Sequence, residues 1–486
     1  MLTCDTLIRN ATLLDGSGAE SEIADVALRG DRIVAVGPSL RIEAAAIIEA
    51  DGLAVAPGFI DTHTHDDIAV IHKPAMLPKI SQGVTTVITG NCGISAAPVR
   101  LAGDPPDPMN LLGEAAAFRY PTFAAYVEAI REAKPAVNVA ALVGHTALRN
   151  NHMDRLDRAA TKAEVSAMRT QLREALDRGA IGLSTGLAYL SASSAAEEEV
   201  LALAQPLRDA GAIYTTHMRS ESAAILDAMR EAFEIGGRCK VPMVISHLKC
   251  AGVDNWGRGA EVLDTLEKAQ RSQTVSCDCY PYAAGSSTLD LRQVDERVKI
   301  TITWSTPHPE VAGKTLAQIA VDWNVPQVEA ARRLQPAGAI YHSISEEDMR
   351  RILRHPTSMI GSDGLPNDPR PHPRLWGTFP RVLGRYCREE KLFSLPEAIH
   401  KMTGMPAERF RLAERGLIRE RYYADVVLFD PESIMDTATF DEPVQPAKGI
   451  VSVWVNGVLS YTSEGLSGNP AGRFLARDSK NDRSAA

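Results

Sequence analysis

The sequence has few of the features that mark membrane proteins and nucleic-acid-binding proteins. No stretch approaches the roughly 18 uninterrupted apolar residues that a membrane-spanning helix needs. Lys and Arg number 52 against 61 Asp and Glu, which gives a net charge of −9. An acidic balance provides no general attraction to nucleic acid or to an anionic membrane. We therefore expect neither as a partner, whereas a small anionic substrate is not excluded, because a few local cations override the net charge.

Cysteines are also few, and their number is odd. The seven cysteines are dispersed over the whole chain and do not indicate a disulfide framework. The first ten residues, MLTCDTLIRN, contain no basic stretch followed by an apolar core, which is the pattern of a secretory signal peptide. We therefore expect a protein of the reducing cytoplasm.

What the sequence does contain is the composition of a large globular chain, with 45% hydrophobic and 23% charged residues in 486. Its two ends resemble each other, because both alternate short apolar runs with turn signals such as Asn456-Gly457. We predict that residues 1–56 and residues 415–486, which include a polar tail, together form one small β-sandwich domain.

Between these ends, apolar strands alternate with amphipathic helices. Runs such as VTTVITG, NVAALVG and PMVISHL read as buried strands. Expected helices cover residues 161–178, 196–210, 222–234 and 259–271, and the first begins with a capping box of Thr161 and Glu164. Repeated strand–helix order predicts an α/β fold, a TIM-like (β/α)8 barrel over residues 57–414. Residues from about 285 to 345 break the order, and we predict an insertion over the barrel mouth.

Residues with metal-binding side chains follow several of the predicted strands. Two of them form an H-x-H pair, and side chains two apart on a strand point the same way. Each residue alone is a weak signal, because a buried Cys or His more often serves packing. All of them at strand ends of one barrel form a stronger pattern, and imidazole, thiolate and carboxylate together suit zinc. The residues are His63, His65, Cys92, His217, His247 and Asp363.

The motifs around these residues resemble those of the amidohydrolase superfamily. G-F-I-D-T-H-T-H-D-D contains the H-x-H pair, S-H-L-K contains His247, and G-S-D-G contains Asp363. The N-C-G motif at Cys92 and the S-T-G-L-A-Y run at Ser184 are more specific, and they resemble the N-acyl-D-amino-acid deacylases, also called D-aminoacylases. Many relatives place a carboxylated lysine on the fourth strand, but AIGLSTG here contains none. The resemblance spans nearly the whole chain.

This resemblance implies a metal centre and a reaction. Cys92, His217 and His247 would bind a tight catalytic zinc, and His63 and His65 would form a second, weaker metal position. Zinc lowers the pKa of water toward about 7 and polarises a carbonyl. Asp363 would contact the metal and its water, act as general base and then return the proton as general acid. The expected reaction is hydrolysis of a linear amide bond, which releases a carboxylate and a free D-amino acid.

The resemblance also implies a clamp for the α-carboxylate of the substrate. In the family, residues that match Lys249, Tyr280, Ser286 and Arg374 hold this group, and Arg374 would offer a bidentate fork. Lys249 lies two residues after His247, so on a strand both would share one face. Tyr189 is a candidate for contact with the acyl group.

The side chain that the enzyme prefers is predicted from the insertion. The sequence ITWSTPHPE resembles the branch that acts on acidic substrates, especially the N-acyl-D-glutamate deacylases. A side-chain carboxylate needs a further cation, for which Arg292 is the first candidate and Arg297 the second, although Asp290 or Asp295 would neutralise them if they paired. Deacylases for hydrophobic N-acyl-D-amino acids or for N-acyl-D-aspartate are the alternatives within the family.

Two further hypotheses lie outside the family. A cyclic amide hydrolase of the same superfamily usually carries the lysine on strand four, and a deaminase uses no cysteine ligand on strand two. A barrel that has become a scaffold would have lost ligands that this chain retains. We expect a monomer or a small homo-oligomer that binds a small N-acyl-D-amino acid.

Overall fold

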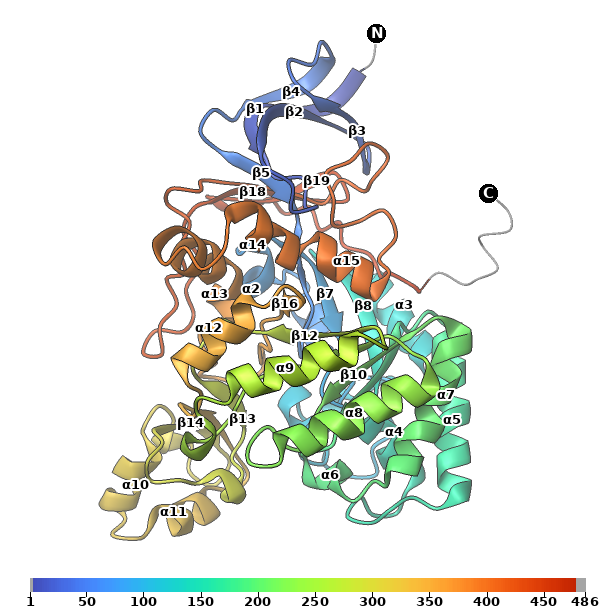
Figure 1. Ribbon diagram of the computed structural model, residues 1–486, viewed down its shortest axis with the longest axis vertical. Coiled ribbons are helices and arrows are strands. Elements are labelled where there is room, and N and C mark those ends of the chain that lie inside the picture. Colours follow the sequence, from blue (N-terminus) through green and yellow to red (C-terminus); the bar gives the residue numbers. More distant parts are fainter. Residues whose placement is uncertain (1–2, 478–486) are drawn as a thin grey trace.

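Eight parallel strands form a nearly closed barrel at the centre of the computed structural model, which describes residues 3–477 (Figure 1). Each strand pairs with the next, and a bridge between Thr64 and Gly364 brings the first and last strands together. The strands are buried on both faces, as the continuous apolar runs require. The predicted barrel is confirmed. Its strands are β6 (Phe59–Asp61), β7 (Val84–Thr89), β8 (Asn138–Gly144), β9 (Gly182–Gly186), β10 (Ile213–His217), β11 (Met243–Ile245), β12 (Val275–Cys279) and β16 (Ser358–Ile360).

Helices cover the outside of the barrel, and each buries one apolar stripe. In α5 this stripe includes Met168, Leu172 and Leu176, and Thr161 and Glu164 form the expected capping box at its start. The longer helices are α3 (Phe123–Ala133), α4 (His145–His152), α5 (Lys162–Asp177), α7 (Glu197–Ala210), α8 (Ile225–Cys239), α9 (Gly259–Gln270), α12 (Glu346–Arg354), α13 (Arg374–Arg381) and α14 (Leu395–Met402). Short helices are α1 (Ala69–His72), α2 (Leu77–Ile80), α6 (Leu190–Ser193) and α15 (Gly404–Phe410), and a π-helix covers Val382–Glu389.

Strands from both ends of the chain form one nine-stranded sheet, which encloses a core of its own. Strand β5 joins the two halves, because it pairs with β1 on one side and with β17 on the other. Side chains from both halves, such as Val26 and Trp454, meet in this core. The strands are β1 (Thr3–Leu13), β2 (Glu22–Arg29), β3 (Arg32–Gly37), β4 (Glu43–Glu49), β5 (Ala54–Pro57), β17 (Val426–Phe429), β18 (Ile450–Val455), β19 (Val458–Thr462) and β20 (Gly465–Leu466).

A third sheet lies at the end of the barrel far from the terminal sheet (Figure 1). It consists of β13 (Gly285–Thr288), β14 (Ile300–Ser305) and β15 (Ala337–Tyr341), and it packs with α10 (Leu316–Asp322) and α11 (Gln327–Leu334) around a separate core. The segment leaves the barrel after β12 and returns before α12, so it follows the carboxyl end of a barrel strand. We propose the domain division expected from the sequence, although the tail beyond residue 477 lies outside the described residues.

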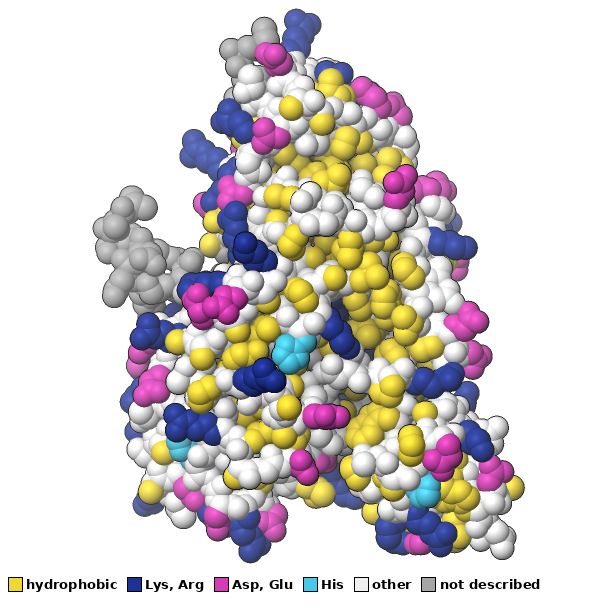
Figure 2. All heavy atoms as spheres, turned by 180° about the vertical axis from the view of Figure 1, so that it is seen from behind, with side chains coloured by type: hydrophobic (Ala, Val, Ile, Leu, Met, Phe, Trp, Pro, Cys, Tyr) yellow, Lys and Arg dark blue, Asp and Glu magenta, His cyan; other side chains and the backbone are white. Residues whose placement is uncertain are grey.

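The surface carries charges of both signs. Lysine and arginine side chains are interspersed with aspartate and glutamate on the face shown in Figure 2. Within residues 3–477, no helix is both long and apolar enough to span a membrane.

Candidate active site

The six candidate metal ligands come together at the carboxyl ends of the barrel strands. His63 and His65 follow β6, Cys92 follows β7, His217 ends β10, His247 follows β11 and Asp363 follows β16. Their ligand atoms form two sets, and within each set the atoms lie within 4.8 Å of one another. One set is His63, His65, Cys92 and Asp363, and the other is Cys92, His217 and His247. The thiolate of Cys92 therefore belongs to both.

Short distances connect the two sets. Sγ of Cys92 lies 3.1 Å from Nε2 of His63 and 3.2 Å from Nε2 of His247. Nε2 of His65 lies 3.1 Å from Oδ1 of Asp363. Imidazole, thiolate and carboxylate groups at this separation are the donors that zinc prefers.

Three of the six residues have a left-handed backbone. The φ angles are 53° at Cys92, 36° at His247 and 50° at Asp363. Such conformations cost about 1–3 kcal/mol each for residues other than glycine and persist only where the surroundings hold them. Three of the six candidate ligands are therefore held in a strained backbone conformation.

The turn that carries Cys92 packs directly against the backbone of β9. The N–H of Gly93, which has a φ of 76°, donates to Oγ of Ser184 at 3.0 Å, and this hydroxyl donates to the carbonyl of Gly90. A Cβ on Gly186 would lie 2.1 Å from the carbonyl oxygen of Cys92. Only glycine leaves room for this approach, so the S-T-G motif of β9 positions the cysteine.

The electrostatics of the cluster favour a cation at its centre. Burial raises the pKa of Cys92, but the nearby His63 and His247 outweigh burial and hold this pKa well below its ordinary value. Burial lowers the pKa of His65 and of His247, but the neighbouring carboxylates and the Cys92 thiolate raise both to about 9. Negative groups here thus stabilise positive charge, which a divalent metal would supply.

An unpartnered nitrogen also fits a metal. Nδ1 of His217 is buried and has no hydrogen-bond partner within residues 3–477, while its Nε2 lies 3.6 Å from Oε2 of Glu221. Nδ1 is therefore the ring nitrogen that is left for a metal ion.

The sequence did not predict two carboxylates that lie beside the cluster, Asp278 and Glu221. Asp278, on β12, lies 3.2 Å from Nδ1 of His63 and accepts the backbone N–H of His247 at 2.8 Å. Glu221 lies 2.8 Å from Nδ1 of His247. An aspartate inside the apolar strand VSCDC was the one sequence feature that could have marked Asp278 as part of the site. Glu221 lies in a loop that contains no such feature.

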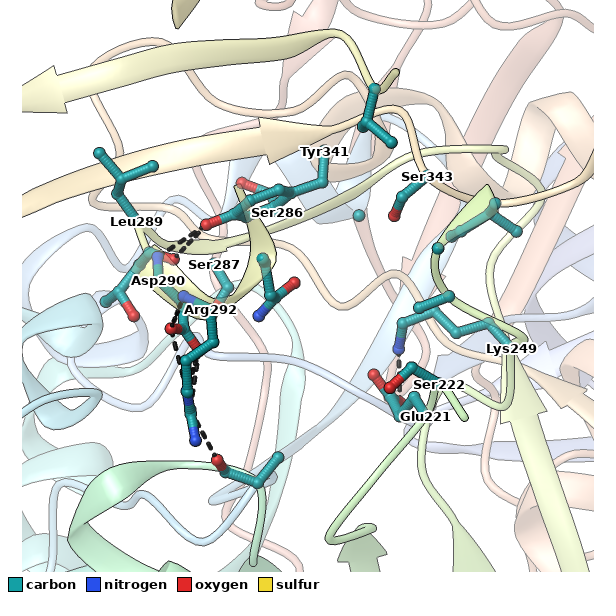
Figure 3. A pocket seen from close by; sticks show the side chains of 18 of the residues that line it. Glu221, Ser222, Lys249, Ser286, Ser287, Leu289, Asp290, Arg292, Tyr341 and Ser343 are labelled. Atoms are coloured by element: carbon teal, nitrogen blue, oxygen red, sulfur yellow. Dashed lines mark hydrogen bonds and ion pairs between the residues drawn. The ribbon is translucent and has the colours of Figure 1, made fainter. Parts of the chain in front are cut away.

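A cavity of about 1070 Å3 opens beside the cluster and is lined by His65, His217, His247 and Asp363. Figure 3 shows Lys249 and Glu221 on one side of it and Arg292, from the insertion, on the other. Tyr189 also lines the cavity, and its ring packs against His217 with the centroids 4.8 Å apart.

Of the expected clamp residues, Lys249, Tyr280 and Ser286 line this cavity, and the fully buried Arg374 contacts Tyr280 and Ser286 without being part of the lining. Nη2 of Arg374 lies 3.1 Å from the carbonyl oxygen of Ser286, and its guanidinium lies 4.6 Å from the centre of the Tyr280 ring. The Tyr280 hydroxyl, the Ser286 hydroxyl, and Nε and Nη1 of Arg374 are buried without a hydrogen-bond partner in the described part of the chain. Buried polar atoms are nearly always satisfied, so these donors are candidates for binding an anionic group.

Arg374 also has a protein partner that the sequence did not predict. Its Nη2 lies 2.9 Å from Oδ2 of Asp363. Burial raises the pKa of Asp363, but Arg374 and His63 outweigh burial and hold this pKa well below its usual range.

The candidate cations for a substrate side chain are paired with aspartates. Arg292 donates through Nε and Nη2 to Asp290 and through Nη2 to the carbonyl of Ala188 (Figure 3). Its Nη1 makes no hydrogen bond within residues 3–477, and its side chain is 54% exposed. Arg297 pairs with Asp254 and Asp295 and is equally exposed.

Comparison with known proteins gives full-length matches. A model of the Amidohydrolase family matches residues 46–461. A D-aminoacylase of Alcaligenes xylosoxydans xylosoxydans is 49% identical, covering 97% of this chain and 98% of that protein. An N-acyl-D-aspartate deacylase of the same organism is 48% identical, covering 97% and 95%. The solved structure of an N-acyl-D-glutamate deacylase from Bordetella bronchiseptica, with zinc and a phosphonate inhibitor, is 43% identical with a TM-score of 0.94, covering 98% and 100%. The chain therefore belongs to the amidohydrolase family and, within it, to the D-aminoacylases and N-acyl-D-amino-acid deacylases.

Proposed function

We propose that the protein is a zinc-dependent deacylase that hydrolyses N-acyl-D-amino acids to a carboxylate and the free D-amino acid. One observation carries the proposal. A thiolate shared by two sets of metal-binding side chains lies beside a cavity with a group of unpartnered donors that suits a carboxylate. Relatives that span the chain carry the corresponding names.

The six ligand residues would hold zinc. Cys92, His217 and His247 form the proposed tight position, and His63, His65 and Asp363 complete a second, weaker position around the same thiolate. When bound, zinc supplies Lewis acidity toward the carbonyl and lowers the pKa of water.

Asp363 is the proposed proton carrier. Its carboxylate lies at the cavity, takes a proton from the attacking water and returns it to the departing nitrogen. An amide requires the second transfer, because an unprotonated amine is a poor leaving group.

The unpartnered donors would bind the α-carboxylate. Arg374 offers Nε and Nη1, which can each donate a hydrogen bond to a carboxylate, while Tyr280 and Ser286 add hydroxyls. Lys249 would add a point charge from the side of His247. The clamp would fix the α-carboxylate of the substrate, and the metal would fix its amide carbonyl. With these two groups of the Cα fixed, the position available to the side chain selects the D-configuration.

For the side chain we propose a preference for D-glutamate. Asp290 and the carbonyl of Ala188 hold Arg292 through Nε and Nη2, which leaves Nη1 as a donor at the cavity. The same ion pair favours a second candidate, a deacylase for hydrophobic D-amino acids, because Asp290 neutralises much of the charge of Arg292.

The kcat/KM values on N-acetyl-D-glutamate, N-acetyl-D-aspartate and N-acetyl-D-leucine, with the L-isomers as controls, decide between these candidates. We expect the highest value for N-acetyl-D-glutamate and no turnover of L-isomers. Preference for N-acetyl-D-leucine would favour the second candidate. If the zinc-loaded protein turns over none of these compounds, the deacylase proposal is contradicted, and a cyclic amide becomes the favoured class of substrate.

We also propose a cytoplasmic location and a monomer or small homo-oligomer. All seven cysteines are free thiols, and Cys92 must remain reduced to bind a metal.

A further inference from the structure

Glu221 lies at the centre of a group of contacts that the proposed reaction does not yet use. It follows His217 by four residues, and its side chain is only 11% exposed. Its Oε1 lies 2.8 Å from Nδ1 of His247 and 2.6 Å from Nζ of Lys249, and its Oε2 lies 3.6 Å from Nε2 of His217. One carboxylate thus faces two proposed metal ligands and one proposed substrate ligand.

The contact with His247 decides which ring nitrogen is available to a metal. Nε2 of His247 faces Sγ of Cys92, whereas Nδ1 faces Glu221. An ionised carboxylate only accepts hydrogen bonds, so it places the proton on Nδ1 and leaves a lone pair on Nε2. Lys249, whose Nζ lies 2.9 Å from the same Nδ1, would favour the opposite tautomer because an ammonium only donates.

Lys249 has other acceptors, which resolves the competition. Its Nζ reaches Oε1 of Glu221 and, at 3.1 Å, the carbonyl oxygen of His247. These two bonds use two of its three donors. Glu221 therefore anchors the lysine as well as the histidine, and one N–H of the lysine remains for a substrate.

His217 faces the other oxygen of the Glu221 carboxylate with its two ring nitrogens in exchanged positions, at 3.6 Å, which is an ion-pair distance and longer than a hydrogen bond. Its Nε2 is the nitrogen nearer to Glu221, and its buried Nδ1 has no partner in the described residues. The carboxylate again favours a proton on the outer nitrogen and a lone pair on the inner one. Carboxylate partners of this kind raise the basicity of metal-binding histidines and fix their orientation.

We propose that Glu221 is a positioning residue that orients both histidines of the Cys92–His217–His247 set for zinc and, through Lys249, couples that set to the substrate carboxylate. This inference rests on the proposed function, since it assumes that these three residues bind the metal. The carboxylate has three partners that can donate to it or carry positive charge, and all three lie within 3.6 Å of its oxygens.

The first test measures the zinc dissociation constant of the apo-protein by competition with a chromophoric chelator. Glu221→Gln keeps the size of the side chain but removes the charge, and its amide can donate as well as accept. We expect zinc binding to weaken by about 10–100-fold. Glu231→Gln serves as the matched control. It makes the same change in a glutamate that pairs with Arg219 and not with a proposed metal ligand, so its zinc dissociation constant should stay near that of the wild type.

The second test concerns the substrate. With zinc at saturating concentration, we expect KM to rise in Glu221→Gln for whichever of the three N-acetyl-D-amino acids the wild type turns over best, because Lys249 loses its anchor. An unchanged KM would overturn the coupling to the substrate.

Other outcomes are equally decisive. Equal zinc affinity in wild type and Glu221→Gln would overturn the inference, even if the variant melts at a lower temperature, because that would show a structural role only. If Glu221→Gln does not fold, Glu221→Asp takes its place, because the shorter side chain cannot reach all three partners. A zinc affinity of Glu221→Asp equal to that of the wild type would also overturn the inference. A wild-type protein that binds no zinc would instead contradict the proposed function.

Discussion

Arg374 and Asp363 form a buried ion pair, with Nη2 of the arginine 2.9 Å from Oδ2 of the aspartate. The proposed substrate clamp therefore touches the proposed general base. When a substrate carboxylate binds Arg374, the attraction that holds the pKa of Asp363 down is shared with a second anion. We expect substrate binding to raise the proton affinity of Asp363, which suits its role as a base.

Asp363→Asn should give a folded protein with very little activity. The amide cannot take the proton of the attacking water, and general base catalysis contributes about 10²–10⁴-fold to such reactions. We expect kcat to fall by at least about 10³-fold, with a melting temperature near that of the wild type. Near-normal turnover in zinc-loaded Asp363→Asn would remove this residue from the mechanism.

Arg374→Gln should lose most of its kcat/KM. Truncation of one partner in a buried, hydrogen-bonded charge pair costs about 2–5 kcal/mol, which corresponds to a loss of about 30-fold or more. Arg381→Gln is the matched control, because Arg381 ends the same helix but pairs with Asp436. If both variants lose activity equally, Arg374 contributes to the packing of α13 and not to substrate binding.

Arg292→Ala should change selectivity more than total activity. A hydrogen bond to a charged group contributes about 1.5–3 kcal/mol, so the ratio of kcat/KM for N-acetyl-D-glutamate over N-acetyl-D-leucine should fall by about 10–100-fold. Arg297→Ala removes an equally exposed arginine of the insertion and should leave this ratio nearly unchanged. An unchanged ratio in Arg292→Ala would exclude Arg292 as the ligand of the side chain.

Removal of the metal with a chelator should abolish hydrolysis and lower the melting temperature. Zinc binds the folded chain and not the unfolded one, so its removal lowers the free energy of unfolding by mass action. Added zinc should restore both activity and melting temperature, whereas magnesium should restore neither, because a thiolate and imidazoles are poor ligands for it. Full activity after exhaustive dialysis against the chelator would contradict a metal-dependent reaction.

Glu199 should stabilise the protein in a pH-dependent way. It is buried beside His145 and Arg149, and although burial raises its pKa, hydrogen bonds to both partners lower it from 4.5 to about 2. A lowered pKa gives stability that is complete above pH 4.5 and is lost as the pH falls toward 2. The shift corresponds to about 3 kcal/mol.

The variant Glu199→Gln isolates this effect. At pH 7 it should melt well below the wild type, and the difference in melting temperature should shrink as the pH falls from 5 toward 3. Glu267→Gln removes an exposed glutamate, which lies 3.3 Å from His355, and should show a much smaller effect. If the difference in melting temperature between Glu199→Gln and the wild type does not vary with pH, the loss of stability comes from packing and not from the charge of Glu199.

The barrel and the clustering of the candidate ligands could be predicted because both depend on local patterns. An apolar run, the end of a strand and a motif such as the one around His63 or Asp363 each span only a few residues. Helix ends were less predictable. Residues 222–234 were expected to be helical, but α8 covers Ile225–Cys239 and continues through Gly236, which packs so closely against Met243 that a Cβ would lie 2.7 Å from its sulfur. That packing overrides the weak helix propensity of glycine.

The partners of the site residues could not be predicted, because they come from distant parts of the chain. Asp278 meets His63 from 215 positions away, and Arg374 meets Asp363 across a loop whose path the sequence does not define. The pairing of Arg292 with Asp290 was foreseen as an alternative, but only the structure shows that it leaves Nη1 without a hydrogen-bond partner among residues 3–477.

The contact between Gly186 and the carbonyl of Cys92 makes residue 186 intolerant of any side chain. The turn that carries Cys92 can approach β9 only because this residue has no Cβ. The metal-binding set therefore depends on a residue that carries no side chain of its own, and a variant such as Gly186→Ala would disturb the position of the thiolate without changing any ligand.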